Sequence, residues 1–262
     1  MTERKLAALH DVLDGFDRIA VAVSGGVDSM TLSAVAHGRV ADAIMFHAVS
    51  PAVPPEATER VRAYADRQGW RLRVVDAGEY DDPDYRANPV NRCFYCKQNL
   101  YGTIAGLTDA PIASGTNLND LGDFRPGLVA AERHGVRHPF VEAEIDKATV
   151  RRIAAGLGLD DIAELPAAPC LSSRIETGIA IDADSLAFVH RIERLLTDGL
   201  SPRTVRCRVR NEGIVVELDP EALDRLSDRP DLKNAVAAAS TGNGYGGEVG
   251  FTAYRMGSAF LR

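Results

Sequence analysis

The chain has 262 residues, of which 45% are hydrophobic and 26% charged, and its formal net charge is −7. This length suits one large domain or two modest ones, and the composition is that of a soluble globular protein. An acidic surface disfavours nonspecific nucleic-acid binding, so we expect no nucleic-acid partner. The N-terminus does not resemble a signal peptide, and no apolar run approaches the roughly 18–20 residues that span a membrane. Four cysteines in a chain of this size do not suggest a disulfide framework. We therefore expect a cytoplasmic protein with reduced thiols and no membrane association.

Short apolar strands alternate with helical stretches between residues 19 and 160. This alternation predicts an α/β domain in which a parallel sheet carries helices on both faces. In such sheets, ligands bind beyond the carboxyl ends of the strands. The predicted strands are Ile19–Val23, Ala43–Val49, Leu72–Val75 and Pro111–Ser114, and the predicted helices lie near 28–38, 55–69, 94–107, 126–134 and 147–157.

A glycine-containing loop, Ser24-Gly25-Gly26-Val27-Asp28-Ser29, directly follows the first predicted strand. Its glycines allow a sharp turn and close approach to an anion, and the N–H groups that open the next helix point towards that anion. The loop lacks the lysine of a Walker A motif, and Asp28 suits a Mg²⁺ ligand better than a phosphate donor. The hexapeptide resembles the pyrophosphate loop of ATP pyrophosphatases, which implies ATP cleavage between the α- and β-phosphates. The alternative is an ordinary Gly-Ser turn. Ser50 and Gly115-Thr116 follow the second and fourth strands, at the same end of the sheet.

Two cysteines in a Cys-x-x-Cys spacing, Cys93 and Cys96, open the helix near 94–107. The helix dipole and the neighbouring Arg92 and Lys97 favour their thiolate forms. A redox disulfide, half of a zinc site and part of an iron–sulfur cluster are all compatible with this spacing. No second Cys/His pair with similar spacing is present to complete a structural zinc site.

The proline-rich tract Leu165–Pro169 ends the α/β pattern. We therefore predict one domain over residues 1–168 and a smaller α+β domain over 169–262. The second domain is expected to contain a helix at 183–198, strands at 203–210 and 213–218, a helical region at 220–239 and a last strand at 247–255. Asn211-Glu212-Gly213 would form a tight hairpin between the first two strands.

A third cysteine, Cys170, stands at this predicted domain junction, followed by Leu171-Ser172-Ser173-Arg174. A lone cysteine is usually a buried structural residue, but a thiol beside a guanidinium is also a candidate nucleophile or metal ligand. Together with the Cys-x-x-Cys pair it makes three thiols, which suit a cluster with one open iron better than a closed zinc site.

The fourth cysteine, Cys207, lies in an alternating strand, Val205-Arg206-Cys207-Arg208-Val209-Arg210. The period of two predicts that Cys207 faces the core and that the arginines share the opposite face. That arginine face is either solvated or a phosphate clamp, for which Arg206 and Arg208 are the better candidates.

These motifs together resemble the LarE family, the ATP-dependent sulfur transferases that make the nickel-pincer nucleotide cofactor. The resemblance covers nearly the whole chain. It rests on Ser24–Ser29, Asn91–Lys97, Gly115-Thr116-Asn117-x-x-Asp120, Arg125-Pro126-Gly127, Cys170–Arg174 and Val205–Arg208.

The resemblance implies a pyrophosphatase-type fold and two half-reactions on a small-molecule substrate, pyridinium-3,5-biscarboxylic acid mononucleotide. A carboxylate of this substrate is adenylated with release of pyrophosphate, and sulfur then displaces AMP. ATP and Mg²⁺ would bind at Ser24, Gly25, Gly26, Asp28, Ser29, Ser50, Gly115 and Thr116. Arg206 and Arg208 match the family's phosphate-binding pair, and Glu193 matches its acidic active-site residue.

The resemblance leaves two sulfur sources to consider. Members with Cys-x-x-Cys hold a 4Fe–4S cluster on three cysteines, which here would be Cys93, Cys96 and Cys170, and a sulfide donor reloads it. Other members sacrifice the cysteine at the Cys170 position. A tRNA-thiolation enzyme of the same superfamily is a further alternative. Amidation with ammonia would need no Cys-x-x-Cys, and a nucleotide-binding regulatory module would have no use for Cys170. We expect the cluster type, assembled as a homo-oligomer.

Overall fold

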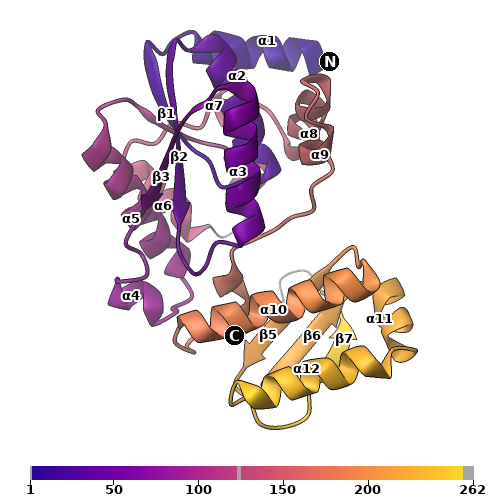
Figure 1. Cartoon of the computed structure of the whole chain (residues 1–262). Coiled ribbons are helices and arrows are strands. Elements are labelled where there is room, and N and C mark those ends of the chain that lie inside the picture. Colours follow the sequence, from indigo (N-terminus) through magenta and orange to yellow (C-terminus); the bar gives the residue numbers. More distant parts are fainter. Residues whose placement is uncertain (1, 123–124, 256–262) are drawn as a thin grey trace. The chain divides into compact units, whose positions relative to one another are not determined.

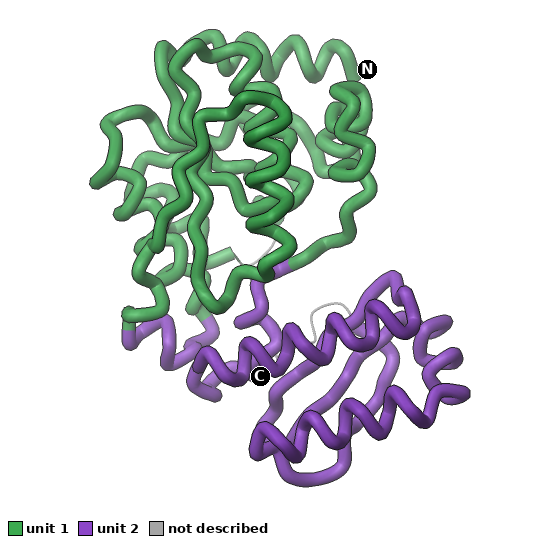
Figure 2. Tube along the Cα trace, in the orientation of Figure 1, with its two compact units in different colours: residues 1–82, 91–168 green, residues 83–90, 169–262 purple. Residues whose placement is uncertain are grey.

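The chain forms two compact units in the computed structural model, which describes residues 2–122 and 125–255 (Figure 2). Unit 1 consists of residues 1–82 and 91–168, and unit 2 consists of residues 83–90 and 169–262. The change of unit after residue 168 falls where the sequence analysis places the domain boundary. The assignment of residues 83–90 to unit 2 differs from that analysis, which puts them in the first domain.

Buried polar contacts attach the 83–90 segment to unit 2. The buried Asn88 side chain donates to three backbone carbonyls between residues 175 and 179, and the Asn88 backbone carbonyl accepts the Gly178 N–H at 3.0 Å. The Tyr85 hydroxyl lies 2.7 Å from Ser172 Oγ. These partners are 87 to 91 residues apart in sequence, so no local sequence pattern predicts these contacts.

Unit 1 is built on a four-stranded parallel sheet in the order β3-β2-β1-β4. This confirms the predicted α/β class. The chain moves outward from β1 through β2 to β3 and then returns to place β4 beside β1. The strand order therefore reverses at the carboxyl ends of β1 and β4, where ligands of open α/β sheets bind. The strands are β1 (Arg18–Ala22), β2 (Asp42–Val49), β3 (Arg71–Asp76) and β4 (Ile112–Ser114).

Helices cover both faces of this sheet, as the strand pattern predicts (Figure 1). Successive β1 residues alternate between two cores: Ile19 and Val21 pack into one, and Ala20 packs into the other. The first core is completed by α1 (Thr2–Leu13), α2 (Val27–Arg39), α3 (Pro55–Gln68) and α8 (Lys147–Gly156), and the second by α5 (Arg92–Leu107) and α6 (Pro126–Arg133). The short elements of unit 1 are η1 (Leu118–Gly122), α7 (Pro139–Glu142) and α9 (Asp160–Ala163).

Unit 2 is a small mixed sheet with helices, which agrees with the predicted α+β class. β5 and β6 are antiparallel and joined by the predicted tight hairpin, since Arg210 pairs with Gly213; β6 and β7 are parallel. Its elements are α4 (Pro83–Arg86), η2 (Leu171–Arg174), α10 (Ala183–Leu200), β5 (Val205–Arg210), β6 (Gly213–Leu218), α11 (Pro220–Ser227), α12 (Pro230–Gly242) and β7 (Gly250–Ala253).

Two elements of unit 2 differ most from the sequence prediction. The single helical region predicted at 220–239 is two helices, because Pro230 opens a new helix and has no N–H to continue the previous one. The last strand covers only Gly250–Ala253 of the predicted 247–255. Among the described residues, no helix is long and apolar enough to cross a membrane.

Candidate functional site

The loop between β1 and α2 is a tight turn that requires glycine. Gly25 has a φ of +85°, and a Cβ there would lie 2.9 Å from the Ala57 carbonyl oxygen. The Ser24 N–H donates to Ser29 Oγ at 3.0 Å, and Ser29 Oγ donates to the Gly26 carbonyl at 3.1 Å. The loop therefore has the backbone shape that close approach to an anion needs, and the opening N–H groups of α2 follow Gly26, which has no side chain to cap them.

Gly115, at the end of β4, packs directly against the start of α2. A Cβ at this position would lie 2.7 Å from the Ser29 nitrogen and 2.8 Å from the Asp28 carbonyl carbon. The residues after β1 and β4 are thus brought together at the point where the strand order reverses. The positions of these motifs after their strands predict that the Ser24–Ser29 loop, Gly115 and Thr116 lie at the same end of the sheet.

Asp28 already has two side-chain partners. Lys147 Nζ lies 2.5 Å from its Oδ2, and Asn117 Nδ2 donates to its Oδ1 at 3.2 Å. Lys147 is the first residue of α8, and its backbone N–H donates to Asn119 Oδ1 at 2.8 Å. The site therefore pairs one carboxylate with one ammonium beside the glycine loop. A metal ion at Asp28 would share this carboxylate with the lysine or displace it, because each carboxylate oxygen has a further lone pair.

Lys147 is a site residue that the sequence analysis does not name. A lysine in the first turn of a helix faces the positive end of the helix dipole, which is unfavourable without a compensating charge. Asp146 caps α8 in the ordinary way, with its carboxylate accepting the Thr149 N–H at 2.7 Å. The lysine that follows a good cap breaks the local charge rule, and this signal could have marked it as a site residue.

The remaining predicted nucleotide residues take part in local hydrogen bonds. Thr116 Oγ1 lies 3.0 Å from Ser114 Oγ, which in turn lies 2.9 Å from His138 Nδ1. Burial lowers the pKa of His138. Ser50 Oγ accepts the Ala52 N–H at 3.3 Å in the turn after β2.

Cys93 and Cys96 lie in the first turns of α5 in unit 1, as predicted. Both are half-buried, and neither forms a disulfide. The N-terminus of α6 packs against this turn: a Cβ on Gly127 would lie 3.0 Å from Lys97 Cγ and 3.5 Å from the Cys93 carbonyl oxygen. The Arg125-Pro126-Gly127 segment therefore lies in close contact with the cysteine-bearing helix, and a side chain at Gly127 would require Lys97 to shift.

Cys170 is exposed and immediately precedes η2 in unit 2. All four residues of η2 are buried, so an exposed thiol stands at the edge of a buried turn. The turn is held from several elements: Tyr85 reaches Ser172, and Arg208 Nη1 donates to the Ser173 carbonyl at 2.8 Å. The alternative that Cys170 is a buried structural cysteine is excluded by its exposure.

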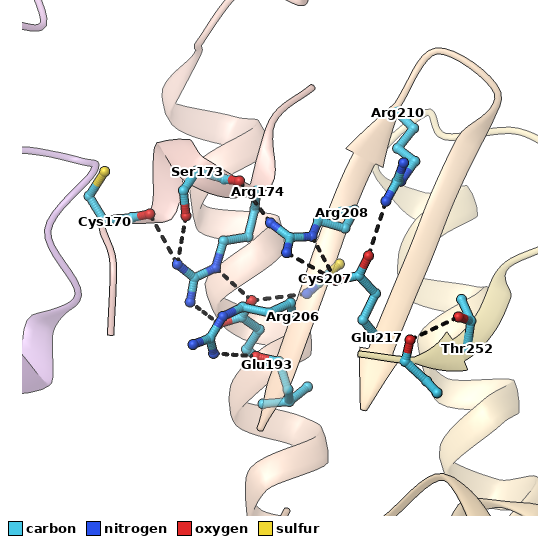
Figure 3. Close-up of polar contacts among 12 residues, drawn as sticks. Cys170, Ser173, Arg174, Glu193, Arg206, Cys207, Arg208, Arg210, Glu217 and Thr252 are labelled. Atoms are coloured by element: carbon cyan, nitrogen blue, oxygen red, sulfur yellow. Dashed lines mark hydrogen bonds and ion pairs between the residues drawn. The ribbon is translucent and has the colours of Figure 1, made fainter. Parts of the chain in front are cut away.

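Glu193 on α10 pairs with Arg174 of η2 through two parallel hydrogen bonds (Figure 3). Arg174 Nε and Nη2 donate to the two carboxylate oxygens, each at 2.9 Å. One of these oxygens also accepts the Cys207 N–H at 2.9 Å. The predicted acidic active-site residue is therefore tied to η2 and to β5.

The arginines of β5 make more side-chain contacts than those of a solvated strand face would. Arg208 Nε and Nη2 donate to Glu217 on β6 at 3.0 and 2.9 Å, and Arg210 donates to the same carboxylate at 3.0 Å (Figure 3). Arg208 and Glu217 are buried, and Arg210 is only partly exposed. Arg206 is half-buried, with its guanidinium 5.9 Å from the centre of the Tyr254 ring. The solvated-face alternative is therefore wrong for Arg208 and Arg210, because both side chains are paired with Glu217 and largely covered. The period of two predicts which residues share a face but not which other residues cover it.

Cys207 is fully buried, which confirms its prediction as a core residue. Burial raises the pKa of its thiol well above the ordinary value. A buried thiol that resists ionisation is a poor metal ligand and a poor nucleophile.

In residues 2–122 and 125–255, no group of three or more His, Cys, Asp or Glu side chains is gathered to hold a metal ion. Cys93 and Cys96 belong to unit 1, and Cys170 belongs to unit 2. The three-cysteine cluster therefore stays a prediction.

Comparison with known proteins assigns the family. No protein-family model matches the chain. The chain is 38% identical over 231 residues to an uncharacterised protein of Synechocystis, covering 86% of this chain and 85% of that protein. It is 30% identical over 233 residues to the pyridinium-3,5-bisthiocarboxylic acid mononucleotide synthase of Lactiplantibacillus plantarum, covering 86% of this chain and 82% of the synthase. This chain belongs to the family of that synthase.

Membership of the synthase family confirms the family resemblance seen in the motifs. Because the alignment with the synthase covers 86% of this chain, it includes parts of both units. An uncharacterised protein of Methanocaldococcus jannaschii is more distant, at 22% identity over 219 residues, with 82% of this chain and 83% of that protein covered.

Proposed function

We propose that this protein is an ATP-dependent sulfur transferase that converts a carboxylate of pyridinium-3,5-biscarboxylic acid mononucleotide into a thiocarboxylate, a step in nickel-pincer cofactor synthesis. The observation that carries this proposal is the relationship to the Lactiplantibacillus synthase, whose name states the bisthiocarboxylic product. The glycine loop of unit 1 and the exposed thiol of unit 2 support it, because the reaction needs one site for ATP and one for sulfur.

The first half-reaction activates the carboxylate, which is a poor acyl donor. A carboxylate oxygen attacks the α-phosphorus of ATP, the bond to the β-phosphate oxygen breaks, and pyrophosphate leaves with that electron pair. The Ser24–Ser29 loop would bind the phosphates through backbone N–H groups, and Ser50, Gly115 and Thr116 would line the same sheet edge. Asp28 fits Mg²⁺, because its carboxylate is a hard oxygen donor and its side chain is 26% exposed to solvent, from which a hydrated ion would reach it. The bound ion would neutralise charge on the departing pyrophosphate.

The second half-reaction delivers sulfur to the acyl carbon, and AMP leaves. We propose that Cys93, Cys96 and Cys170 hold a 4Fe–4S cluster, which would supply the transferred sulfide when bound. Their thiols fit this role because all three are accessible, whereas the buried Cys207 does not. In the alternative, the Cys170 thiolate attacks the acyl carbon itself, and elimination of the thiocarboxylate then leaves dehydroalanine.

The substrate phosphate is proposed to bind at Arg206 and Arg208. Guanidinium groups match phosphate oxygens in pairs. Arg206 is the more accessible of the two, since it is half-buried and Arg208 is buried. A phosphate at Arg208 would have to compete with Glu217, which already accepts two of its hydrogen bonds. We further propose a cytoplasmic homo-oligomer that is reloaded by a sulfide donor.

The test is anaerobic turnover of the reconstituted protein with ATP, Mg²⁺, substrate and excess sulfide. Pyrophosphate and AMP are expected, together with thiocarboxylate in excess of one equivalent per chain and an unchanged Cys170 mass. ADP as the main product would overturn the adenylation step. If product stops at one equivalent per chain and Cys170 is lighter by the mass of H₂S, the cluster mechanism is wrong and Cys170 is itself the sulfur donor.

A further inference from the structure

The exposed Cys170 thiol is carried by a backbone that a single buried guanidinium holds in place. The Arg174 side chain is only 4% exposed. Its Nη1 donates to the Pro169 carbonyl at 2.6 Å, to the Cys170 carbonyl at 3.0 Å and to Ser173 Oγ at 3.0 Å. The guanidinium therefore bonds the peptide groups on both sides of the Cys170 Cα. Figure 3 shows its bonds to Cys170 and Ser173.

The other edge of the same guanidinium is fixed by Glu193. Nε and Nη2 of Arg174 point to the two Glu193 oxygens at 2.9 Å each, a planar fork that admits one orientation. Glu193 is itself held, because one of its oxygens accepts the Cys207 N–H of β5 at 2.9 Å. A chain of hydrogen bonds thus runs from β5 through Glu193 and Arg174 to the Cys170 carbonyl.

This arrangement leaves Glu193 little capacity for acid–base chemistry. Its two oxygens already accept three hydrogen bonds, and its side chain is 12% exposed. A carboxylate in this state can orient a partner, but a general acid must reach the reacting atoms with a proton to give.

We infer that Arg174 and Glu193 are positioning residues that fix the Cys170 backbone and so direct its sulfur for transfer, with Glu193 acting through Arg174. The inference rests on the proposed function. Sulfur attack on an acyl carbon demands close alignment, and a displacement of about 1 Å can cost 10²-fold in rate. Breaking this buried pair would leave the Arg174 charge uncompensated, so the pair strongly restrains the guanidinium.

The experiment compares the two half-reactions in Glu193→Gln and in Arg174→Met/Glu193→Gln. The glutamine oxygen can still accept the Cys207 N–H, whereas the double variant removes the buried charge along with its partner. We expect thiocarboxylate formed per pyrophosphate released to fall about 10- to 100-fold in both variants, with pyrophosphate release unchanged. The double variant should lose at least as much as the single one, because it also removes the Arg174 bonds to the Pro169 and Cys170 carbonyls. If the single variant fails to fold, the ratio of thiocarboxylate to pyrophosphate in the double variant tests the inference.

A second readout does not depend on turnover. The amides of Ser173 and Ile175 donate to the Cys170 and Ser172 carbonyls at 3.0 and 3.2 Å, and they should lose hydrogen-exchange protection in both variants. The matched control is Asp231→Asn, which breaks a two-bond Arg229–Asp231 pair in the same unit, away from Cys170, and should change neither readout.

Three outcomes decide the matter separately. Variants that keep both the coupling ratio and the amide protection would overturn the inference. A Glu193→Gln protein that loses transfer while Ser173 and Ile175 stay protected would make Glu193 a catalytic residue and also overturn it. Wild-type protein that releases no pyrophosphate would overturn the proposed function instead, and the hydrogen-exchange result would still test the clamp.

Discussion

Each unit places an ion pair beside its candidate motif, and the two pairs differ in burial. The Asp28 and Lys147 side chains of unit 1 are 26% and 35% exposed, whereas Arg174 and Glu193 of unit 2 are 4% and 12% exposed. A solvated pair contributes little to stability and can change partners, but a buried guanidinium that loses its carboxylate keeps an uncompensated charge. Unit 1 therefore has a charge pair suited to exchange with a ligand, whereas the buried charges of unit 2 hold the backbone of η2 in place.

The largest expected effect comes from removing the sulfur that the unit 2 scaffold carries. Cys170→Ala should abolish thiocarboxylate formation while pyrophosphate release continues, because the glycine loop and Asp28 belong to unit 1. Product and pyrophosphate are measured in the same anaerobic assay. Cys207→Ala is the control: this buried thiol should be dispensable for transfer and for any cluster, with a packing loss of about 1 kcal/mol. If Cys170→Ala still forms thiocarboxylate, Cys170 is not the sulfur-carrying residue, and the role assigned to unit 2 in this comparison is wrong.

The next largest effect tests whether the buried charges of unit 2 are structural. Glu217→Gln leaves Arg208 and Arg210 without their shared carboxylate, and we expect a loss of about 3–5 kcal/mol in the free energy of unfolding. Denaturant titration measures it. The exposed pair in Asp231→Asn should leave the midpoint nearly unchanged. Equal midpoints for the two variants would mean that Glu217 is no more important than a surface carboxylate.

The parts of this contrast that sequence predicts are those encoded in short patterns. The Ser24–Ser29 loop follows an apolar strand and opens a helix, and Gly25 is required by a positive φ and a close contact. The period of two in β5 correctly predicts that Cys207 faces the core. Strand–helix alternation likewise predicts the parallel sheet that brings Gly115 beside the loop.

The parts that sequence misses depend on contacts between distant residues. Asp28 and Lys147 are 119 positions apart, and Asn88 reaches carbonyls 87 to 91 positions away. Alternation places Arg208 opposite the core but does not show that Glu217 and the Ser173 carbonyl cover that face. Such pairs form only when the chain packs, so the local patterns of a single sequence do not predict which distant residues meet.

A smaller effect tests whether the Asp28–Lys147 pair of unit 1 exchanges partners when nucleotide binds. The direction of the change in Mg²⁺·ATP affinity on Lys147→Ala distinguishes the two possibilities. If Lys147 moves from Asp28 to the nucleotide phosphates, Lys147→Ala should weaken Mg²⁺·ATP binding by about 10- to 150-fold, the value of one charge-assisted hydrogen bond. If Lys147 only occupies Asp28, the same change should tighten binding, because the metal no longer competes with the ammonium. Calorimetric titration distinguishes the two. Lys5→Ala, which breaks the exposed pair with Glu144 in the same unit, is the control.

The smallest effect concerns a buried group behind the glycine loop, His47 on β2. The ring is 1% exposed, with Nδ1 2.8 Å from the Val23 carbonyl and Nε2 2.9 Å from Thr58 Oγ1. Since a carbonyl only accepts, Nδ1 carries the proton, and Nε2 accepts from the hydroxyl. Burial lowers the pKa of His47 in the folded protein. The loop of unit 1 is thus backed by a neutral, buried hydrogen-bonding residue.

The lowered pKa of His47 predicts how stability changes with pH. Above the unfolded pKa of about 6.5, His47 is neutral in both states, and its contribution is complete. As pH falls through this value, the unfolded chain gains a proton that the folded protein does not take. The free energy of unfolding therefore decreases, by at most about 1.4 kcal/mol per pH unit for this group, until the lower folded pKa is reached. His47→Gln should flatten this part of the profile, and His37→Gln, at an exposed position, should not. Identical slopes in wild type and His47→Gln would show that His47 titrates alike in both states, and the comparison would then stand on the ion pairs alone.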